Sequence, residues 1–429
     1  MMDSKRVAIR YLTVFILVFV ALNTGCGETD DGEFDPDELG GELIESDVER
    51  AEATATDEML HNYARGQADF AFEFKRTGFD ADESAVFSSY SMAEVLTIAS
   101  TFGNFDDQEV QALYDAVRIE DIDDAYDSSN TFRQRLEGRI ERADDDEVGY
   151  ANLNDIWVEQ ADNAHAFFAL DELKRYFGIG VRVTPLDSDT EVGADNINEY
   201  IEYFTRGLIE DFIQPAQLVD VFAVATTVLY LKASWSDSFS EAGERDFYVD
   251  DETTTDVPVI RGDSHVQINL DEQGQAPADG EPLVMSVLLA GEFSFDIIAP
   301  ERGSFADFRD DFDADTYYEL LADRSSAEVN VTMPSFKLES SPAAKQVMVE
   351  AFGLPGSMFE PGKIGDIIHD AVIDVNETGI EAAAASAVTF AGNDDQGPML
   401  SVDVDRSFMY MVRDRQTGML MFSGQYLGD

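Results

Sequence analysis

From about Met59 to the C-terminus, apolar residues recur at spacings typical of helices in the first half and of strands in the second. No segment repeats another. The expected helices cover residues 59–75, 92–102 and 195–212, and the expected strands cover residues 221–231, 329–334 and 400–412. Residues 283–298 are expected to form a hairpin that turns at Gly291-Glu292. Helices followed by strands predict one mixed α+β domain with large sheets.

The charge of the chain limits its partners. There are 88 Asp and Glu against 28 Lys and Arg, which gives a formal net charge of −60. Apolar residues still make up 44% of the chain and aromatic residues 11%, which is unlike a disordered protein. The acidity repels phosphates, so it argues against nucleic-acid binding and against attraction to an anionic membrane. A folded, acidic, lysine-poor chain is typical of adaptation to high salt.

The N-terminal residues 1–25 are expected to be a signal peptide. Basic residues precede an apolar run from Tyr11 to Leu22, which is too short to span a bilayer as a helix. The run ends close to Cys26, in a pattern similar to a bacterial lipobox, so we expect Cys26 to be lipidated. The alternative is an ordinary signal peptide with an incidental cysteine. Cys26 is the only cysteine, so no intramolecular disulfide can form.

Residues 26–57 are rich in Asp, Glu, Gly and Thr and are expected to form an acidic tether before a domain over residues 58–429. This organisation predicts an exported protein, either anchored by lipid to the cell envelope (outer membrane or cell surface) or extracellular. Any membrane contact is expected only through the lipid on Cys26.

Motifs of common enzymes are missing from the sequence. The four histidines are His61, His165, His265 and His369, and no HExxH, CxxC, GxSxG or P-loop motif occurs. Carboxylates are so abundant that pairs of them distinguish nothing. A zinc site would need thiols or clustered imidazoles. We therefore expect no catalytic residue, no metal and no cofactor.

Several blocks of sequence, taken in order, resemble the serpins, the serine protease inhibitor family. They are Phe87–Ser91, Ile197–Ile209, Thr227–Trp235, His369–Ala385, Asp405–Phe408 and Gly418–Gly424. The resemblance implies an α+β serpin fold with three β-sheets, about nine helices and an exposed reactive loop near the C-terminus. In that family a protease attacks the loop and forms an acyl-enzyme. The loop then inserts into sheet A and distorts the protease.

The resemblance places a hinge at the start of the reactive loop. Its residues are Glu377, Gly379, Ile380, Glu381, Ala382, Ala383, Ala384 and Ala385. An inserting strand must alternate between core and solvent, and the inward series that starts at Ile380 is uncharged as far as Phe390. Taken alone, the alanine run would favour a helix. Many inhibitory serpins have Thr where this chain has Ile380, so its bulk is expected to slow early insertion.

The cleaved bond follows from the usual distance between hinge and bond in the family. Counting from Glu377 places it between Asn393 and Asp394, and a register shift of one residue would place it at Gly392 or Asp394. No Lys or Arg lies between Glu381 and Val404, which argues against trypsin-like targets. Asn393 suits an asparagine-specific cysteine protease, whereas Gly392 suits an elastase- or subtilisin-like serine protease.

Further residues correspond to regions that control insertion in serpins. Ser88, Ser91, Thr227 and His369 match the shutter, a polar cluster that parts when the loop inserts, and Trp235 matches the breach, where the loop enters. Thr227 replaces the family's Asn, so the shutter is expected to be looser or re-bonded. Arginines at 133, 135, 139 and 142 are expected to pair with glutamates of their own helix rather than bind polyanions.

These observations predict a protease inhibitor that acts as a suicide substrate on a serine or cysteine protease. We expect it to be a monomer and not an enzyme. The alternative is a non-inhibitory serpin-fold protein that binds a partner or has a structural role at the cell surface.

Overall fold

The computed structural model describes residues 39–119, 121–144, 147–271, 274–277, 280–359, 366–380 and 400–429. Glu38–Asp429 form one compact unit, distinct from Met1–Asp37. The domain therefore begins about twenty residues before the expected boundary at residue 58. Within the expected tether, Glu42–Ile44 form the short strand β1, which pairs with β5 (Val181–Val183). Apolar Leu43 and Ile44 give this segment a strand that its acidic composition concealed.

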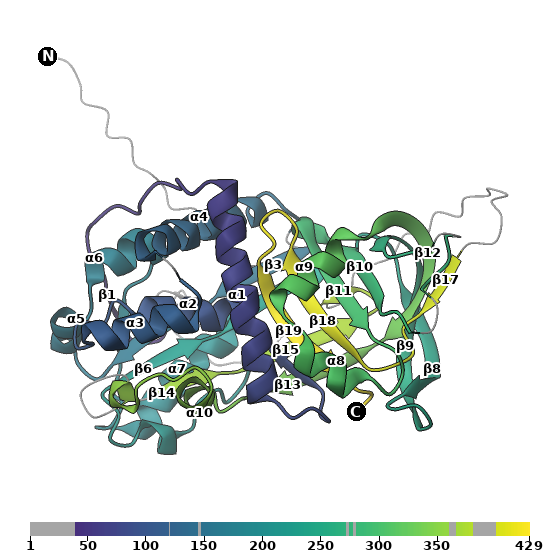
Figure 1. Cartoon of the computed structure of the whole chain (residues 1–429). Coiled ribbons are helices and arrows are strands. Elements are labelled where there is room, and N and C mark those ends of the chain that lie inside the picture. The colour runs from purple at the N-terminus through teal and green to yellow at the C-terminus, as the bar shows by residue number, and fades with distance from the viewer. Residues whose placement is uncertain are drawn as a thin grey trace, which may run out of the picture. The chain divides into compact units, whose positions relative to one another are not determined.

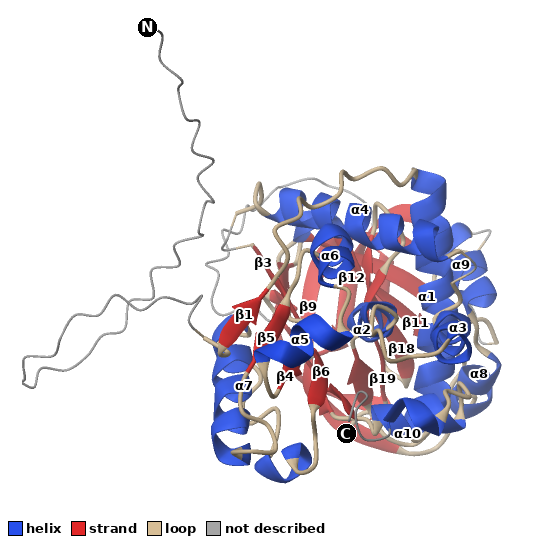
Figure 2. Cartoon of the chain, turned by 90° about the vertical axis from the view of Figure 1, so that its left-hand side faces the viewer, coloured by secondary structure: helices blue, strands red, loops and turns tan. Residues whose placement is uncertain are grey.

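Ten α-helices occur among the described residues, close to the nine expected. They are α1 (Asp57–Gly78), α2 (Ser89–Ala99), α3 (Asp107–Ala116), α4 (Ile122–Ile140), α5 (Ala161–Phe167), α6 (Leu170–Glu172), α7 (Thr190–Phe204), α8 (Phe305–Asp311), α9 (Ala314–Ala322) and α10 (Ala344–Glu350). Short π- or 3₁₀-helical turns are η2 (Leu173–Phe177), η3 (Pro215–Leu218), η4 (Ala290–Glu292) and η5 (Gly356–Phe359). Figure 2 shows that helices surround the strands on several sides.

The helix expected over residues 195–212 is displaced toward the N-terminus. It begins at Thr190, capped by the side chain of Asp189, and ends at Phe204. The Thr205 hydroxyl donates to the carbonyl of Ile201, and Gly207 adopts a φ of +77°, which favours glycine. The helix therefore stops where the chain turns left-handed, and apolar periodicity alone did not reveal that turn.

Two five-stranded sheets share three chain segments. Sheet I has the order β1, β5, β4 (Asp155–Val158), β6 (Ala223–Thr227), β14 (Asp366–His369). Sheet II has the order β13 (Phe336–Ser340), β15 (Ala371–Asn376), β16 (Gly379–Ile380), β7 (Leu229–Ser234), β3 (Val148–Asn152). Each of the segments β3–β4, β6–β7 and β14–β15 contributes one strand to sheet I and the other strand to sheet II. The two sheets are therefore joined end to end by three continuous chain segments.

The single strand expected over residues 221–231 is in fact β6 and β7, which belong to different sheets. Val228 separates them, and its carbonyl accepts a hydrogen bond of 2.9 Å from the amide of Leu153. Leu153 itself lies between β3 and β4. The pairing between strands is therefore interrupted at the same place in two neighbouring segments, at Val228 in one and at Leu153 in the other. A continuous apolar run does not reveal such a break, because both halves are buried.

Sheet III has nine strands among the described residues, and Figure 1 shows most of them to the right of α1. Its order is β17 (Leu400–Asp403), β12 (Ser325–Pro334), β9 (Thr254–Ile268), β10 (Leu283–Leu289), β11 (Phe293–Ala299), β18 (Phe408–Asp414), β19 (Leu420–Tyr426), β2 (Ala85–Phe87), with β8 (Ser240–Tyr248) paired to β9. The expected hairpin is present as β10 and β11. The strand expected over residues 400–412 is two strands, β17 and β18, that lie far apart in sheet III.

The main core lies between sheets II and III. Leu231, Val375 and Ile380 of sheet II share one buried cluster with Phe295 and Tyr410 of sheet III. A second buried cluster joins α1 and α2 to β6 and β14 of sheet I and to β18 of sheet III. These two helices therefore pack against strands of both sheets. Helix α1 crosses between the two halves in Figure 1.

Candidate functional site

The predicted hinge begins with a tight turn. Strand β15 ends at Asn376, and β16 begins at Gly379 after the two turn residues Glu377 and Thr378. The side-chain oxygen of Asn376 accepts hydrogen bonds from the Thr378 amide (2.9 Å) and hydroxyl (2.6 Å). Gly379 has a φ of +151°, and a Cβ there would lie 2.2 Å from the carbonyl oxygen of Ala233. The turn thus requires glycine at this position.

Strand β16 lies between β15 and β7 and is antiparallel to both. Gly379 pairs with Asn376 and Ser234, and Ile380 pairs with Val375 and Ala233. The first two residues that follow the turn are therefore already a strand of sheet II. Sheet II therefore holds Gly379 and Ile380 of the predicted hinge between β15 and β7.

Trp235, the predicted breach residue, contacts the hinge directly. Its backbone amide donates to the Thr378 carbonyl (3.1 Å) and its indole Nε1 donates to the Asn376 carbonyl (2.7 Å). The ring packs against Phe239 and Phe295 at centroid distances of 5.4 and 5.9 Å. The turn is therefore held by both the backbone and the side chain of the residue that directly follows β7.

Ile380 is 1% exposed and belongs to the main core. The side chain that was expected to slow insertion is thus already accommodated between the two neighbouring strands. Its burial also gives the phase of the alternation, in which Ile380 faces inward. The other predicted hinge residues, Glu381 and Ala382–Ala385, lie outside the described residues, as do Gly392, Asn393 and Asp394 at the predicted bond.

Sheet I is closed, because its strands β14 and β6 are direct neighbours, whereas in sheet II β16 lies between β15 and β7. Strands β14 and β6 pair directly in parallel, and His369 stands opposite Thr227. The amide of Ser88 donates to His369 Nε2 (3.1 Å), which leaves the ring proton on Nδ1, within 3.3 Å of the Thr227 carbonyl. His369 is 1% exposed, and burial lowers its pKa from 6.5 to about 4. The neutral imidazole therefore bridges α2, β6 and β14.

Two serines complete the predicted shutter. The Ser88 hydroxyl caps α2 by accepting from the Ser91 amide (3.2 Å) and donates to the Met421 carbonyl (3.0 Å). The Thr227 hydroxyl lies 2.7 Å from the Ser91 hydroxyl. The structure thus brings Ser88, Ser91, Thr227 and His369 into one buried cluster. Thr227 is hydrogen-bonded rather than free, in agreement with the re-bonded alternative for this replacement.

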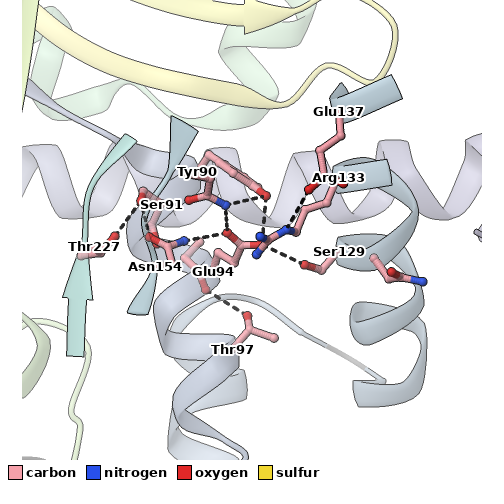
Figure 3. A network of polar contacts seen from close by, with 12 residues as sticks. Tyr90, Ser91, Glu94, Thr97, Ser129, Arg133, Glu137, Asn154 and Thr227 are labelled. Atoms are coloured by element: carbon pink, nitrogen blue, oxygen red, sulfur yellow. Dashed lines mark hydrogen bonds and ion pairs between the residues drawn. The ribbon is translucent and has the colours of Figure 1, made fainter. Parts of the chain in front are cut away.

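Sequence reasoning missed the residues beneath the shutter (Figure 3). Asn154 accepts a hydrogen bond of 2.6 Å from the Ser91 hydroxyl, and its amide donates to Glu94 (2.6 Å). Glu94 is fully buried and forms an ion pair of 3.2 Å with Arg133 of α4. A carboxylate within the apolar run of residues 92–102 was the available signal. One carboxylate does not stand out in the sequence of a chain with 88 acidic residues.

The expected pairing of arginines within α4 is wrong for most of them. Among the described residues, the 3.8 Å contact between Arg133 and Glu137 is the one ion pair of these arginines that lies within α4. The other ion pairs reach different elements, with Arg133 bound to Glu94, Arg135 to Asp57 and Arg139 to Asp414. Helical spacing shows which charges share a face, but it does not show which neighbour packs against that face.

No group of His, Cys, Asp and Glu side chains that could hold a metal ion occurs in the described part of the chain. Over the same ranges, no helix is long and apolar enough to cross a bilayer.

The fold and the site define a protein in which Gly379 and Ile380 of the predicted hinge already pair with two strands of one sheet. The continuations of these strands, β14 and β6, are held together by a buried polar cluster. The chain belongs to the serpin family, because the model of that family, "Serpin (serine protease inhibitor)", matches residues 65–428. Serpins are generally protease inhibitors rather than enzymes.

Similar proteins come from distant organisms. An uncharacterized serpin-like protein of Thermococcus kodakarensis is 27% identical over 295 residues, which cover 64% of this chain and 66%, just under two thirds, of that protein. Mouse neuroserpin is 24% identical over 290 residues, with 64% of this chain and 70% of neuroserpin covered. The structure of tengpin, a thermophilic serpin, matches with a TM-score of 0.69 at 17% identity, over 91% of this chain and 98% of tengpin.

Proposed function

We propose that this protein inhibits a protease as a suicide substrate. The protease nucleophile attacks a carbonyl in the reactive loop, the peptide bond breaks, and the new amine takes a proton from the catalytic acid of the protease. The N-terminal part of the loop stays bound to the protease as an acyl group. It then inserts between β15 and β7, continues β16, and distorts the attached protease.

One observation carries this proposal, namely the position of β16. Residues Gly379 and Ile380 already pair with both flanking strands, so insertion extends an existing strand. Each added residue gains backbone hydrogen bonds to two neighbours. The inward series after Ile380 is uncharged, so extension buries no unpaired carboxylate.

The target and the bond remain proposals from the sequence. We place the bond between Asn393 and Asp394, with Gly392 as the alternative, and expect a serine or cysteine protease that does not require Lys or Arg. We further propose that the protein is a monomer exported by residues 1–25 and held by a lipid on Cys26.

The test is incubation of the mature protein in salt with a panel of serine and cysteine proteases, followed by denaturing gels and mass spectrometry. A covalent complex is expected for a serine protease. For a cysteine protease, lasting inactivation with cleavage of the loop is expected. Cleavage of the loop with full protease activity and no gain in heat stability would contradict inhibition and favour a non-inhibitory binding or structural role.

A further inference from the structure

The carboxylate of Glu94 is the end point of the polar contacts that lead to the shutter. It is fully buried in α2, and its two oxygens face only donors. The donors are Tyr90 Oη (2.9 Å), Ser129 Oγ (3.2 Å) and Arg133 Nη1 (3.2 Å) on Oε1, and Asn152 Nδ2 (2.5 Å) and Asn154 Nδ2 (2.6 Å) on Oε2. They come from α2, α4, β3 and the residues that join β3 to β4 (Figure 3).

This carboxylate determines the direction of every hydrogen bond between it and the shutter. Asn154 donates its amide to Glu94, so its oxygen faces Ser91 and accepts from the Ser91 hydroxyl (2.6 Å). The single hydroxyl hydrogen of Ser91 is then used. The Ser91 oxygen must therefore accept from the Thr227 hydroxyl, 2.7 Å away. All hydrogens in the series Thr227, Ser91, Asn154 point toward Glu94.

We propose that Glu94 is a positioning residue for loop insertion. Through Asn154 and Ser91 its charge orients the Thr227 hydroxyl and holds β6 against α2, which opposes the separation of β6 from β14. The role rests on the proposed inhibitory function, in which these two strands must part. In this role Glu94 acts through Asn154 and Ser91. It sets how readily the sheet opens.

The charge matters as well as the shape. A glutamine at position 94 has the same volume but presents one NH₂ group to donors that all need acceptors. If the NH₂ group takes the position of Oε2, Asn154 turns over, Ser91 donates in the other direction, and Thr227 loses its acceptor. If it takes the position of Oε1, it meets the donors of Tyr90, Ser129 and Arg133 instead. Arg133, whose side chain is 8% exposed, would keep only Glu137 at 3.8 Å.

The experiment measures how fast the intact protein takes up a synthetic peptide with the sequence of residues 381–392, followed by labelled peptide on native gels. Glu94→Gln should accelerate uptake about tenfold. Glu137→Gln makes the same charge change beside Arg133 but lies outside the series, so uptake should stay within about twofold of wild type. Val412→Ala, in sheet III, controls for a general loss of stability, since Val412 is fully buried there.

The uptake rates of Glu94→Gln and Val412→Ala are compared with each variant held the same number of degrees below its own melting temperature. The inference is overturned if Glu94→Gln then takes up peptide no faster than Val412→Ala. If Glu94→Gln does not fold, Ser91→Ala decides, because it cuts the series and leaves all five donors of Glu94 in place. An unchanged uptake rate in that variant also overturns it. A wild type that is cleaved without trapping any protease contradicts the proposed function instead, and the peptide rates still test Glu94.

Discussion

Sheets I and II share three chain segments and differ in how two of these segments meet. In sheet II, β15 and β7 are separated by the two residues of β16, whereas in sheet I the continuations of these strands, β14 and β6, pair directly. A single pair of neighbouring strands is therefore open at one end and closed at the other. The boundary between the two states falls at His369, Asp370 and Val228.

The two ends use different chemistry. The open end is held by backbone pairing, by Trp235 and by the apolar side chain of Ile380. The closed end is held by buried hydrogen bonds of His369, Ser91 and Thr227. Apolar contacts at the open end can be extended by any small uncharged residue. The polar contacts at the closed end must be broken first, and each has a net value of about 1 kcal/mol.

The largest effect is expected from a charge on the inserting strand. The alternation that starts with Ile380 makes Ala384 an inward residue, so Ala384→Asp would bury a carboxylate at a cost of several kcal/mol. We expect the variant to become a substrate, with a loss of inhibition of about 100-fold or more. The measurement is the number of inhibitor molecules consumed for each protease molecule inactivated.

Ala383→Asp is the matched control, because residue 383 belongs to the outward series. It should inhibit nearly as well as wild type. Equal loss in both variants would mean that charge anywhere in this stretch is harmful, and retained inhibition in Ala384→Asp would show that the inward series has the other phase.

Acid should weaken the closed end. His369 has a pKa of about 4 in the folded protein and about 6.5 when unfolded. Above pH 6.5 both states are neutral. As pH falls from 6.5 to 4, the unfolded state takes up a proton that the folded state does not, so stability decreases by about 3 kcal/mol.

The measurement is the free energy of unfolding between pH 4 and pH 7 for wild type and His369→Gln. Other groups, such as Asp370, whose pKa is raised by burial, cancel in the difference between the two proteins. The free energy of unfolding of wild type minus that of His369→Gln should decrease as the pH falls from 6.5 to 4. A difference that is flat with pH would mean that His369 is not neutral and buried in solution.

The open end should be sensitive at Gly379. In Gly379→Ala the Cβ would overlap the Ala233 carbonyl oxygen, so β16 should leave the sheet with a loss of about 2 kcal/mol. Trp235 reports this change if Trp157, the second of two tryptophans, is replaced by Phe. We expect a red shift of its emission. Gly353→Ala is the control, since Gly353 has a φ of +71° and nothing within 4 Å of the added Cβ.

Much of the fold could be predicted from the sequence, but its breaks could not. The α+β class and the hairpin at Gly291 follow from periodicity, and serpin membership followed from motifs in family order. Val221–Leu231 and Leu400–Val412 each looked like one strand. Their division depends on which distant segment pairs with each half, and a local pattern does not contain that information.

The site was predictable only where the family supplied a motif. Ser88, Ser91, Thr227 and His369 were selected in this way, and the structure brings them together. Glu94 and Arg133 have no motif, and their significance comes from burial, which depends on α2 and α4 packing together. In an acidic chain a single carboxylate is visible as unusual only when its exposure is known.

Salt is expected to have the smallest effect on the comparison, because it should stabilise the open and the closed end equally. The net charge of the chain is −60, and few of the acidic residues that the structure describes are buried. A higher salt concentration shortens the reach of repulsion between exposed charges from about 10 Å at 0.1 M to about 3 Å at 1 M. The melting temperature should therefore rise by several degrees in molar NaCl. Both ends should gain alike, because the His369 cluster and the Ile380 contacts are buried and uncharged.

Differential scanning calorimetry in NaCl, with sucrose as a control that does not screen charge, measures the first part of this prediction. Hydrogen exchange at the amides of Ile380 and Thr227 measures the second part, since these residues report on the open and the closed end. A melting temperature that does not change between low and molar NaCl would remove the argument for adaptation to high salt. Protection that rises at only one end would mean that surface charge acts on the opening of the sheet, and not only on the stability of the whole domain.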